Sequence, residues 1–129
     1  MNIITTIRSA AVVLLAFVAL AASAKEVPFT QAAFDKAVAA GQPVIVHVQA
    51  SWCPTCKVQR PIVESLLQDP KRKNVTLFSA DFDTEAALKK QLRVSQQSTF
   101  VVFKGGKEVG RSTGETQKDA IAALFDKAL

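Results

Sequence analysis

The sequence predicts an α/β fold in which a central mixed sheet ends in an antiparallel hairpin and is flanked by helices. Short, nearly continuous β-branched runs alternate along the chain with segments whose apolar residues recur at helical spacing. A helical segment joins the first two long runs, as in a right-handed parallel crossover unit. The last two runs are joined by Gly105-Gly106, which is typical of a hairpin turn. The expected order is β-α-β-α-β-α-β-β-α.

The N-terminal segment, residues 1–24, has the layout of a secretory signal peptide. Arg8 precedes an apolar run that ends in the small residues Ala22 and Ala24. The uncharged window covers only residues 9–24, whereas a membrane-spanning helix needs about 18 or more residues. This length favours a cleaved signal over a retained anchor. We expect a domain of residues 25–129 in the periplasm or otherwise secreted, with no stable membrane insertion after cleavage.

The charge balance of the mature chain is only modestly basic. Without Arg8, 15 Lys and Arg remain against 11 Asp and Glu. Part of the excess lies in residues 71–73, which we expect in a solvated loop. Aromatic side chains that would stack on bases are not interleaved with these charges, so we expect no nucleic-acid partner.

The first half of the mature chain is predicted to form a short strand, a helix and a buried strand. Thr30 is the expected N-cap of the helix, and Gly41 marks its end. Its apolar stripe comprises Phe34, Ala37 and Val38. Residues 43–50 form an almost unbroken β-branched run, which predicts a strand buried on both faces of a parallel sheet.

A second helix, strand and helix follow. The helix over residues 53–68 contains Pro61, which we expect to kink it. Its apolar positions are Val58, Ile62, Leu66 and Leu67. Residues 74–83 predict another buried strand, and residues 84–94 a short amphipathic helix with Thr84 as its cap. Leu88 and Leu92 are the inward positions of that helix.

The chain closes with a hairpin and a helix. Residues 100–104 and 107–112 are the expected strands of the hairpin. Thr116 and Asp119 have the spacing of a capping box at the start of the last helix. Its apolar stripe comprises Ile121, Leu124, Phe125 and Leu129.

Cys53 and Cys56 are the only cysteines, and they lie where the strand over residues 43–50 gives way to a helix. Sites in open α/β sheets usually form at this carboxyl end of the strands. Pro54 suits the first helical position, and the helix N-terminus favours negative charge on the Cys53 sulfur. Because the thiolate is the attacking species in disulfide exchange, we expect Cys53 to be an exposed, low-pKa nucleophile. Cys56, one turn on, would be the resolving thiol.

Two other interpretations of the cysteine pair stay open. A closed zinc site needs four ligands, whereas the chain offers two thiolates and a single histidine, His47. A metal or cluster would therefore have to be shared between two chains. An inert disulfide between Cys53 and Cys56 would close so short a loop that it would constrain the unfolded chain very little.

These residues carry a resemblance to a known family. The segment QASWCPTCKVQRPIVESL resembles the active-site segment of the thioredoxin family, which has Trp-Cys-x-x-Cys-Lys and a proline five residues after the second cysteine. Trp52, Lys57 and Pro61 match that pattern. The segment STFVVFKGGKEVGRSTG resembles the later hairpin of the family, with Gly114 matching a glycine near the last helix. The resemblance covers residues 27–129.

The resemblance implies a thioredoxin-like three-layer fold and a thiol–disulfide oxidoreductase. Cys53 and Cys56 would form its redox-active disulfide, and protein disulfides or dithiols would be its substrates. The substrate-contact surface would comprise Trp52, Pro54, Thr55, Ser98 and Thr99. No small-molecule cofactor and no bound metal are implied. We expect a monomer that also meets an upstream redox partner.

The sequence departs from the family pattern at two positions. Ser98 stands where thioredoxins have a cis-proline that shapes the substrate groove and keeps metal from the thiols. A non-proline cis bond costs about 2.5–4 kcal/mol, which favours a trans peptide before Ser98. His47 stands where the family has a buried acidic residue that accepts a proton from the second cysteine. His47 is therefore either a proton acceptor or a core histidine satisfied by a backbone carbonyl.

The missing proline also keeps a second class of function open. A thioredoxin-fold binding module with little turnover would hold a metal or cluster between chains, or would dock a partner peptide. A disulfide-reduction assay on metal-free protein distinguishes this class from the oxidoreductase.

Overall fold

The computed structural model describes residues 24–129, so nearly all of the predicted signal peptide lies outside the described residues. The predicted order of elements is confirmed, with one added turn of 3-10 helix. The strands are β1 (Lys25–Pro28), β2 (Val44–Gln49), β3 (Thr76–Asp81), β4 (Thr99–Lys104) and β5 (Lys107–Thr113). The helices are α1 (Gln31–Ala39), α2 (Pro54–Leu67), η1 (Pro70–Arg72), α3 (Ala86–Leu92) and α4 (Lys118–Asp126). Within residues 24–129 no helix is long and apolar enough to cross a membrane.

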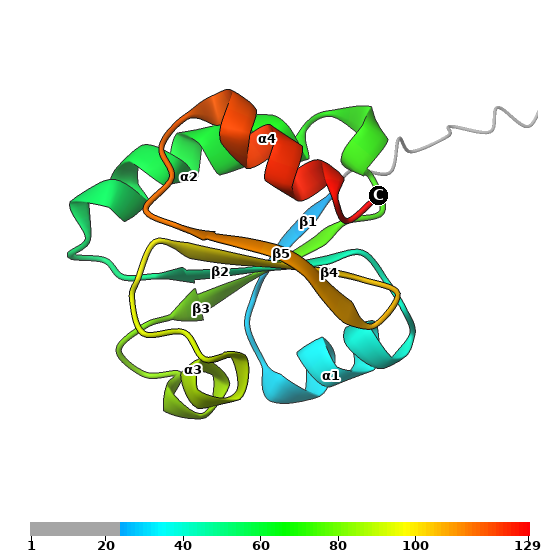
Figure 1. The fold of residues 1–129 in the computed structure, drawn as a ribbon, viewed down its shortest axis with the longest axis horizontal. Coiled ribbons are helices and arrows are strands. Elements are labelled where there is room, and N and C mark those ends of the chain that lie inside the picture. Colours follow the sequence, from blue (N-terminus) through cyan, green and yellow to red (C-terminus); the bar gives the residue numbers. More distant parts are fainter. Residues whose placement is uncertain (1–23) are drawn as a thin grey trace, which may run out of the picture.

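The five strands form one mixed sheet in the order β1-β3-β2-β4-β5. β3 runs parallel to both β1 and β2, whereas β4 is antiparallel to β2 and to β5. Helices α1 and α3 cover one face of the sheet, and α2 and α4 cover the other (Figure 1). The predicted three-layer α/β fold with a C-terminal hairpin is confirmed.

The central strand β2 divides the core into two halves. Alternate residues face opposite sides, so Val46 packs in the cluster under α1 and α3, and Ile45 packs in the cluster under α2 and α4. Phe34, Phe78 and Phe103 build the first cluster through edge-on ring contacts. Because strand β2 is buried from Val44 to Val48, it is a rigid base for the residues that follow it.

Three details of the helices differ from the sequence prediction. Helix α2 continues through Pro61, and its predicted apolar positions Leu66 and Leu67 are buried. Val58, however, is 49% exposed, and Gln59 and Val63 are buried in addition. Neither Thr84 nor Thr116 caps a helix: the N-caps of α3 and α4 are Glu85 and Gln117, without a side-chain cap. The predicted apolar stripe of the last helix holds except at Leu129, which follows the helix and is exposed.

Local polar contacts explain the two misplaced caps. The Asp81 side chain accepts a hydrogen bond from the Asp83 N–H, which closes a turn after β3 and delays the start of α3. Before α4, a carboxylate oxygen of Glu115 accepts hydrogen bonds from the N–H groups of Thr116 and Gln117. In both places an acidic side chain satisfies backbone N–H groups just before the helix, and the helix begins one residue later than the threonine predicted.

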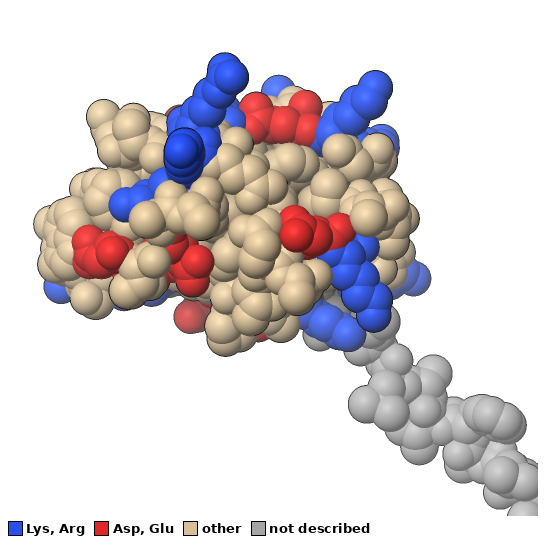
Figure 2. All heavy atoms as spheres, turned by 90° about the horizontal axis from the view of Figure 1, so that it is seen from below, with Lys and Arg blue, Asp and Glu red and all other residues tan. Residues whose placement is uncertain are grey.

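Acidic and basic side chains are interspersed over the face that α1 and α3 form (Figure 2). That face therefore presents mixed charge and no continuous basic patch of the kind that nucleic acid requires.

Candidate active site

The two cysteines lie at the N-terminus of α2, directly after the carboxyl end of β2. Cys53 is the N-cap, Pro54 occupies the first turn, and the Cys53 sulfur accepts a hydrogen bond from the Cys56 N–H at 3.1 Å. Both cysteines are free thiols in this structure. The predicted placement of Cys53, Pro54 and Cys56 is confirmed.

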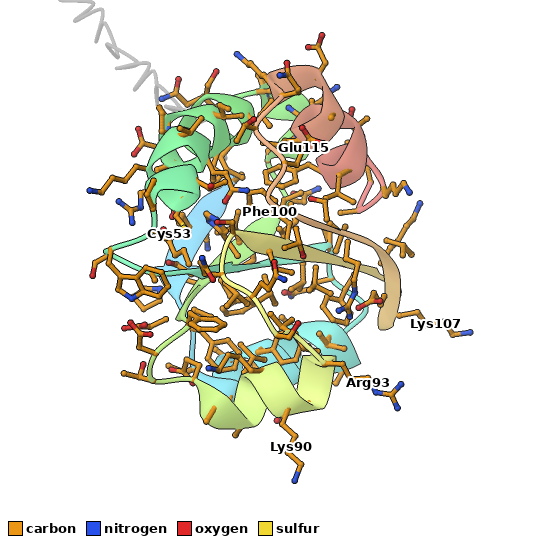
Figure 3. All side chains as sticks on the ribbon, turned by 60° about the vertical axis from the view of Figure 1, so that its left-hand side comes forward. Cys53, Lys90, Arg93, Phe100, Lys107 and Glu115 are labelled. Carbon is orange, nitrogen blue, oxygen red and sulfur yellow. The ribbon has the colours of Figure 1, made fainter. Side chains whose placement is uncertain are left out.

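The expectation that Cys53 is exposed is wrong, because the residue is only 1% exposed. Ala50 and the half-buried Phe82 pack around the two cysteines, and Ser98 lies against both sulfurs. Figure 3 shows Cys53 at the start of α2, near the end of the sheet at which Phe100 lies. Loops on either side of a helix start can fold over its N-cap residue and bury it. The sequence pattern does not reveal whether they do.

Ser98 provides the only hydroxyl that touches the sulfurs among the described residues. Its Oγ lies 3.0 Å from Sγ of Cys53 and 3.1 Å from Sγ of Cys56. The described chain contains no cis peptide bond, so the expected trans peptide before Ser98 is confirmed. Ser98 instead adopts a left-handed backbone conformation, with φ of 60°.

The pKa of Cys53 reflects two opposing effects. Burial alone would raise it, because a thiolate is poorly solvated inside the protein. Hydrogen bonds from the Cys56 thiol, the Ser98 hydroxyl and the N–H groups of Cys56 and Thr55 outweigh burial, so the pKa of Cys53 lies below its ordinary value. The low pKa expected for Cys53 thus comes from a built set of donors around its sulfur.

His47 lies in β2 beneath α2 and is 1% exposed. Its Nε2 is 2.9 Å from Oε1 of Gln59, and its ring stacks on Phe100 with centroids 4.3 Å apart. The Gln59 amide nitrogen donates to the carbonyl oxygens of Ser98 (3.2 Å) and Glu115 (2.9 Å). Two carbonyl acceptors fix the orientation of this amide, so its oxygen faces His47 and Nε2 of His47 carries the hydrogen.

Burial lowers the pKa of His47 to about 4, so the ring is neutral at physiological pH. Its hydrogen-bond partner is a side-chain amide, and the backbone carbonyl expected for a core histidine does not fill this place. Among the described residues no hydrogen bond joins His47 to either sulfur; the connection runs through Gln59 to the Ser98 carbonyl. A direct proton-accepting role for His47 stays a prediction.

The expected contact surface is split between exposed and buried residues. Trp52 is 53% exposed, its Nε1 donates to Asp83 at 2.7 Å, and its indole packs edge-on against Phe82. Pro54 is exposed and Thr55 is half-buried. Ser98 and Thr99 are buried, and the Thr99 hydroxyl donates to the carbonyl oxygen of Gln96. Trp52 and Pro54 are therefore the exposed residues of this set.

Sequence reasoning missed Gln59 and Asp83. Gln59 was open to detection, because it falls one turn after Cys56 on the buried face of a helix, where a polar residue needs partners. Asp83 gave no such signal, since its contact with Trp52 joins two loops that are distant in sequence.

The described residues contain no group of three or more His, Cys, Asp or Glu side chains placed to hold a metal ion. A metal on the two thiolates would need ligands from outside this part of the chain, since a closed site takes four.

Comparisons with known proteins agree with the fold. The family model for thioredoxin matches residues 25–127. A thioredoxin of Chlamydia trachomatis is 35% identical over 98 residues, which cover 76% of this chain and 93% of that protein. A thioredoxin of Staphylococcus aureus is 32% identical over 103 residues, covering 80% of this chain and 97% of the relative. Among solved structures, Trxlp from Edwardsiella tarda EIB202 is 43% identical with a TM-score of 0.75, over 80% of this chain and 98% of that one.

Proposed function

This chain belongs to the thioredoxin family and is a thiol–disulfide oxidoreductase, and we propose that Cys53 is its nucleophile and Cys56 its resolving thiol. The observation that carries the assignment is the asymmetry of the pair. The Cys53 sulfur caps α2 and accepts a hydrogen bond from the Cys56 N–H, whereas within residues 24–129 no backbone N–H is hydrogen-bonded to the Cys56 sulfur. Negative charge is therefore better stabilised on Cys53.

The reaction uses two electrons and two sulfur exchanges. The Cys53 thiolate attacks one sulfur of a partner disulfide, and the other partner sulfur leaves as a thiolate. Cys56 then attacks the mixed disulfide at Cys53 and displaces the first partner sulfur. The products are a reduced partner and a Cys53–Cys56 disulfide, which an upstream redox partner reduces again. Run in reverse, the same steps oxidise a dithiol.

Protein disulfides are the substrate class, and Trp52 and Pro54 support this assignment because both are exposed beside the pair. A flat indole next to a reactive sulfur offers apolar contact to a peptide. The protein acts as a monomer in this proposal. Its setting is the periplasm or another extracytoplasmic space, as residues 1–24 suggest, where disulfides form and persist.

We place its reduction potential above that of a cytosolic thioredoxin. A buried carboxylate near two thiols opposes their ionisation, whereas His47 is neutral, with a pKa of about 4. A better stabilised thiolate makes the reduced form more stable, and a more stable reduced form is a stronger oxidant. Glutathione equilibrium of the purified protein measures this potential directly.

Trapping of the mixed disulfide tests the assignment of roles. Purified Cys56→Ser and Cys53→Ser proteins are each incubated with insulin, whose disulfides serve as the probe, and resolved on a non-reducing gel. We expect a covalent adduct with Cys56→Ser and none with Cys53→Ser. Equal adducts from both variants would overturn the roles.

The wild-type protein serves as the turnover control in the same assay. Catalytic reduction of insulin by metal-free protein in the presence of dithiothreitol is the expected result. No turnover, combined with metal or cluster absorbance in protein as purified, would instead support the binding-module alternative.

A further inference from the structure

The Ser98 hydroxyl fills the space between the two reactive sulfurs. Its Oγ is within hydrogen-bond distance of both Cys53 and Cys56, at 3.0 and 3.1 Å. Ser98 is 3% exposed, so little bulk water reaches this space. In the part of the chain that the structure describes, no other side-chain oxygen or nitrogen is hydrogen-bonded to the Cys56 sulfur.

The backbone conformation that holds Ser98 in this place is unfavourable for serine. Its φ of 60° is left-handed, a conformation that residues other than glycine rarely adopt because Cβ comes too close to the backbone. Its carbonyl oxygen accepts hydrogen bonds from the Gly114 N–H at 2.9 Å and from the Gln59 amide, and these contacts fix the peptide. Proline cannot adopt this conformation, because its ring holds φ near −65°. Strained residues that persist in this way cluster at functional sites, which points to a role for the hydroxyl.

A hydroxyl between two sulfurs has a defined hydrogen-bonding capacity. It has one hydrogen to donate and two lone pairs that accept. In the reduced pair, the Cys56 S–H and the Ser98 hydroxyl both donate to the Cys53 thiolate. Once Cys53 is bonded to a partner sulfur, the Cys56 S–H is released and can donate to Ser98 Oγ, its neighbour at 3.1 Å. The Ser98 hydroxyl therefore connects the proton on Cys56 with the Cys53 sulfur, where bonds form and break.

The second step of exchange requires a group that takes the proton from Cys56. Cys56 must lose its proton to attack the mixed disulfide, because the thiolate is the nucleophile. His47 does not take this proton through Nε2, since that nitrogen already carries a hydrogen directed at Gln59. Of the described polar side chains, the Ser98 hydroxyl is the group in contact with the departing proton.

We propose that Ser98 is a catalytic residue that relays the Cys56 proton to the departing partner sulfur. The inference rests on the exchange reaction proposed above. The Cys56–Cys53 bond forms, and the bond between Cys53 and the partner sulfur breaks with its electron pair on the partner. The Cys56 proton passes to Ser98 Oγ, and the hydroxyl gives its own hydrogen to the partner thiolate. Serine is thus unchanged at the end, and the partner leaves as a neutral thiol.

The relay is tested by timing the two steps separately with oxidised glutathione as the probe. Reduced Ser98→Gly is compared with wild type by rapid acid quench, and mass spectrometry follows the protein–glutathione adduct. Glycine removes the hydroxyl and accepts a left-handed backbone readily, so the fold is preserved and the strain is relieved. Ser98→Thr keeps a hydroxyl, and Ser95→Gly makes the same change at an exposed serine in the preceding loop.

We expect the adduct of Ser98→Gly to form but to resolve about a hundredfold more slowly than that of wild type near neutral pH. The deficit should shrink at alkaline pH, where solvent removes the Cys56 proton, and Ser98→Thr should restore part of the rate. Ser95→Gly should resolve like wild type. An unchanged resolution rate in Ser98→Gly, or a deficit of the same size at every pH, would overturn the relay. Absence of any adduct in Cys56→Ser, which cannot resolve the mixed disulfide, would instead count against the proposed nucleophile.

Discussion

Two clusters of buried polar groups lie at opposite ends of α2, and they differ in what they do with charge. At the N-terminus of the helix, His47, Gln59 and Ser98 form a neutral chain of hydrogen bonds that ends on the cysteine sulfurs. Beyond its C-terminus, η1 buries the guanidinium of Arg72, which is 2% exposed, next to the end of α4 (Figure 1). The first cluster is neutral, and its hydrogens can pass between hydrogen-bonded groups. The second, which we call the Arg72 cluster, comprises Arg72, Asp69, Asp126 and the Leu66 carbonyl and holds a permanent charge on Arg72.

Each nitrogen of the buried Arg72 guanidinium lies close to an oxygen atom. The guanidinium donates to Asp126 through Nε and Nη2, at 3.0 and 2.7 Å, and to the carbonyl oxygen of Leu66 at 3.1 Å. Oδ2 of Asp69 lies 3.5 Å from Nη1 of Arg72. Because every buried donor meets an oxygen, this end ties α2, η1 and α4 together. The comparison indicates that the buried permanent charge of Arg72 stabilises the fold. The neutral groups next to the cysteines, whose protons can move, instead support the reaction.

Removal of Arg72 should lower the stability of the fold without affecting the cysteines. Arg72→Leu leaves the Leu66 carbonyl and one face of Asp126 without a donor. We expect the free energy of unfolding to fall by about 2–3 kcal/mol, less than for a fully buried pair because both carboxylates are partly exposed. Urea unfolding measures this loss, with Lys73→Leu as an exposed control. The pKa of Cys53 should not change, and a clear shift would show that the clusters are coupled.

Acid should weaken the two clusters in different pH ranges. The pKa of His47 is lowered from 6.5 to about 4 in the folded protein, so the unfolded chain binds the extra proton first. Stability is fully present above the unfolded pKa and should fall by about 3 kcal/mol between pH 6.5 and 4. His47→Gln, which keeps a donor but does not titrate, should lose this dependence. A wild-type stability that stays flat over this range would contradict the burial of a neutral ring.

The Arg72 cluster should respond only at lower pH. Burial would raise the pKa of Asp126, but the hydrogen bond from Lys71 and the charge of Arg72 outweigh burial and hold it below its usual value. A lowered carboxyl pKa contributes stability above the unfolded pKa that is lost as pH falls through the folded one.

The smallest effect is expected at the rim of the Arg72 cluster. Lys71 pairs with Asp126 at 3.0 Å, but the two side chains are 50% and 36% exposed. Lys71→Ala should therefore lower the free energy of unfolding by about 0.5 kcal/mol or less, since exposed pairs contribute little. A loss as large as that of Arg72→Leu would show that Lys71, and not burial of the guanidinium, holds this end together.

Sequence patterns predicted the fold well because its elements follow local rules. The β-branched run of β2 and the Gly105-Gly106 turn need no distant partner to be recognised, and they place Cys53 at the start of a helix. Exposure of Cys53 was predicted wrongly, because burial depends on how Ser98 and Phe82 fold over the helix start. The partner of His47 was also out of reach, since Gln59 meets it only when α2 packs on the sheet.

The division of roles between Cys53 and Cys56 is tested most directly by alkylating the reduced wild-type protein. Iodoacetamide is added briefly over a range of pH, and peptide mass spectrometry measures the rate at each cysteine separately. We predict that Cys53 reacts first, with a pKa below its ordinary value, and that Cys56 remains unmodified near neutral pH. Reaction of Cys56 before Cys53, or of both with the same pH dependence, would contradict the account.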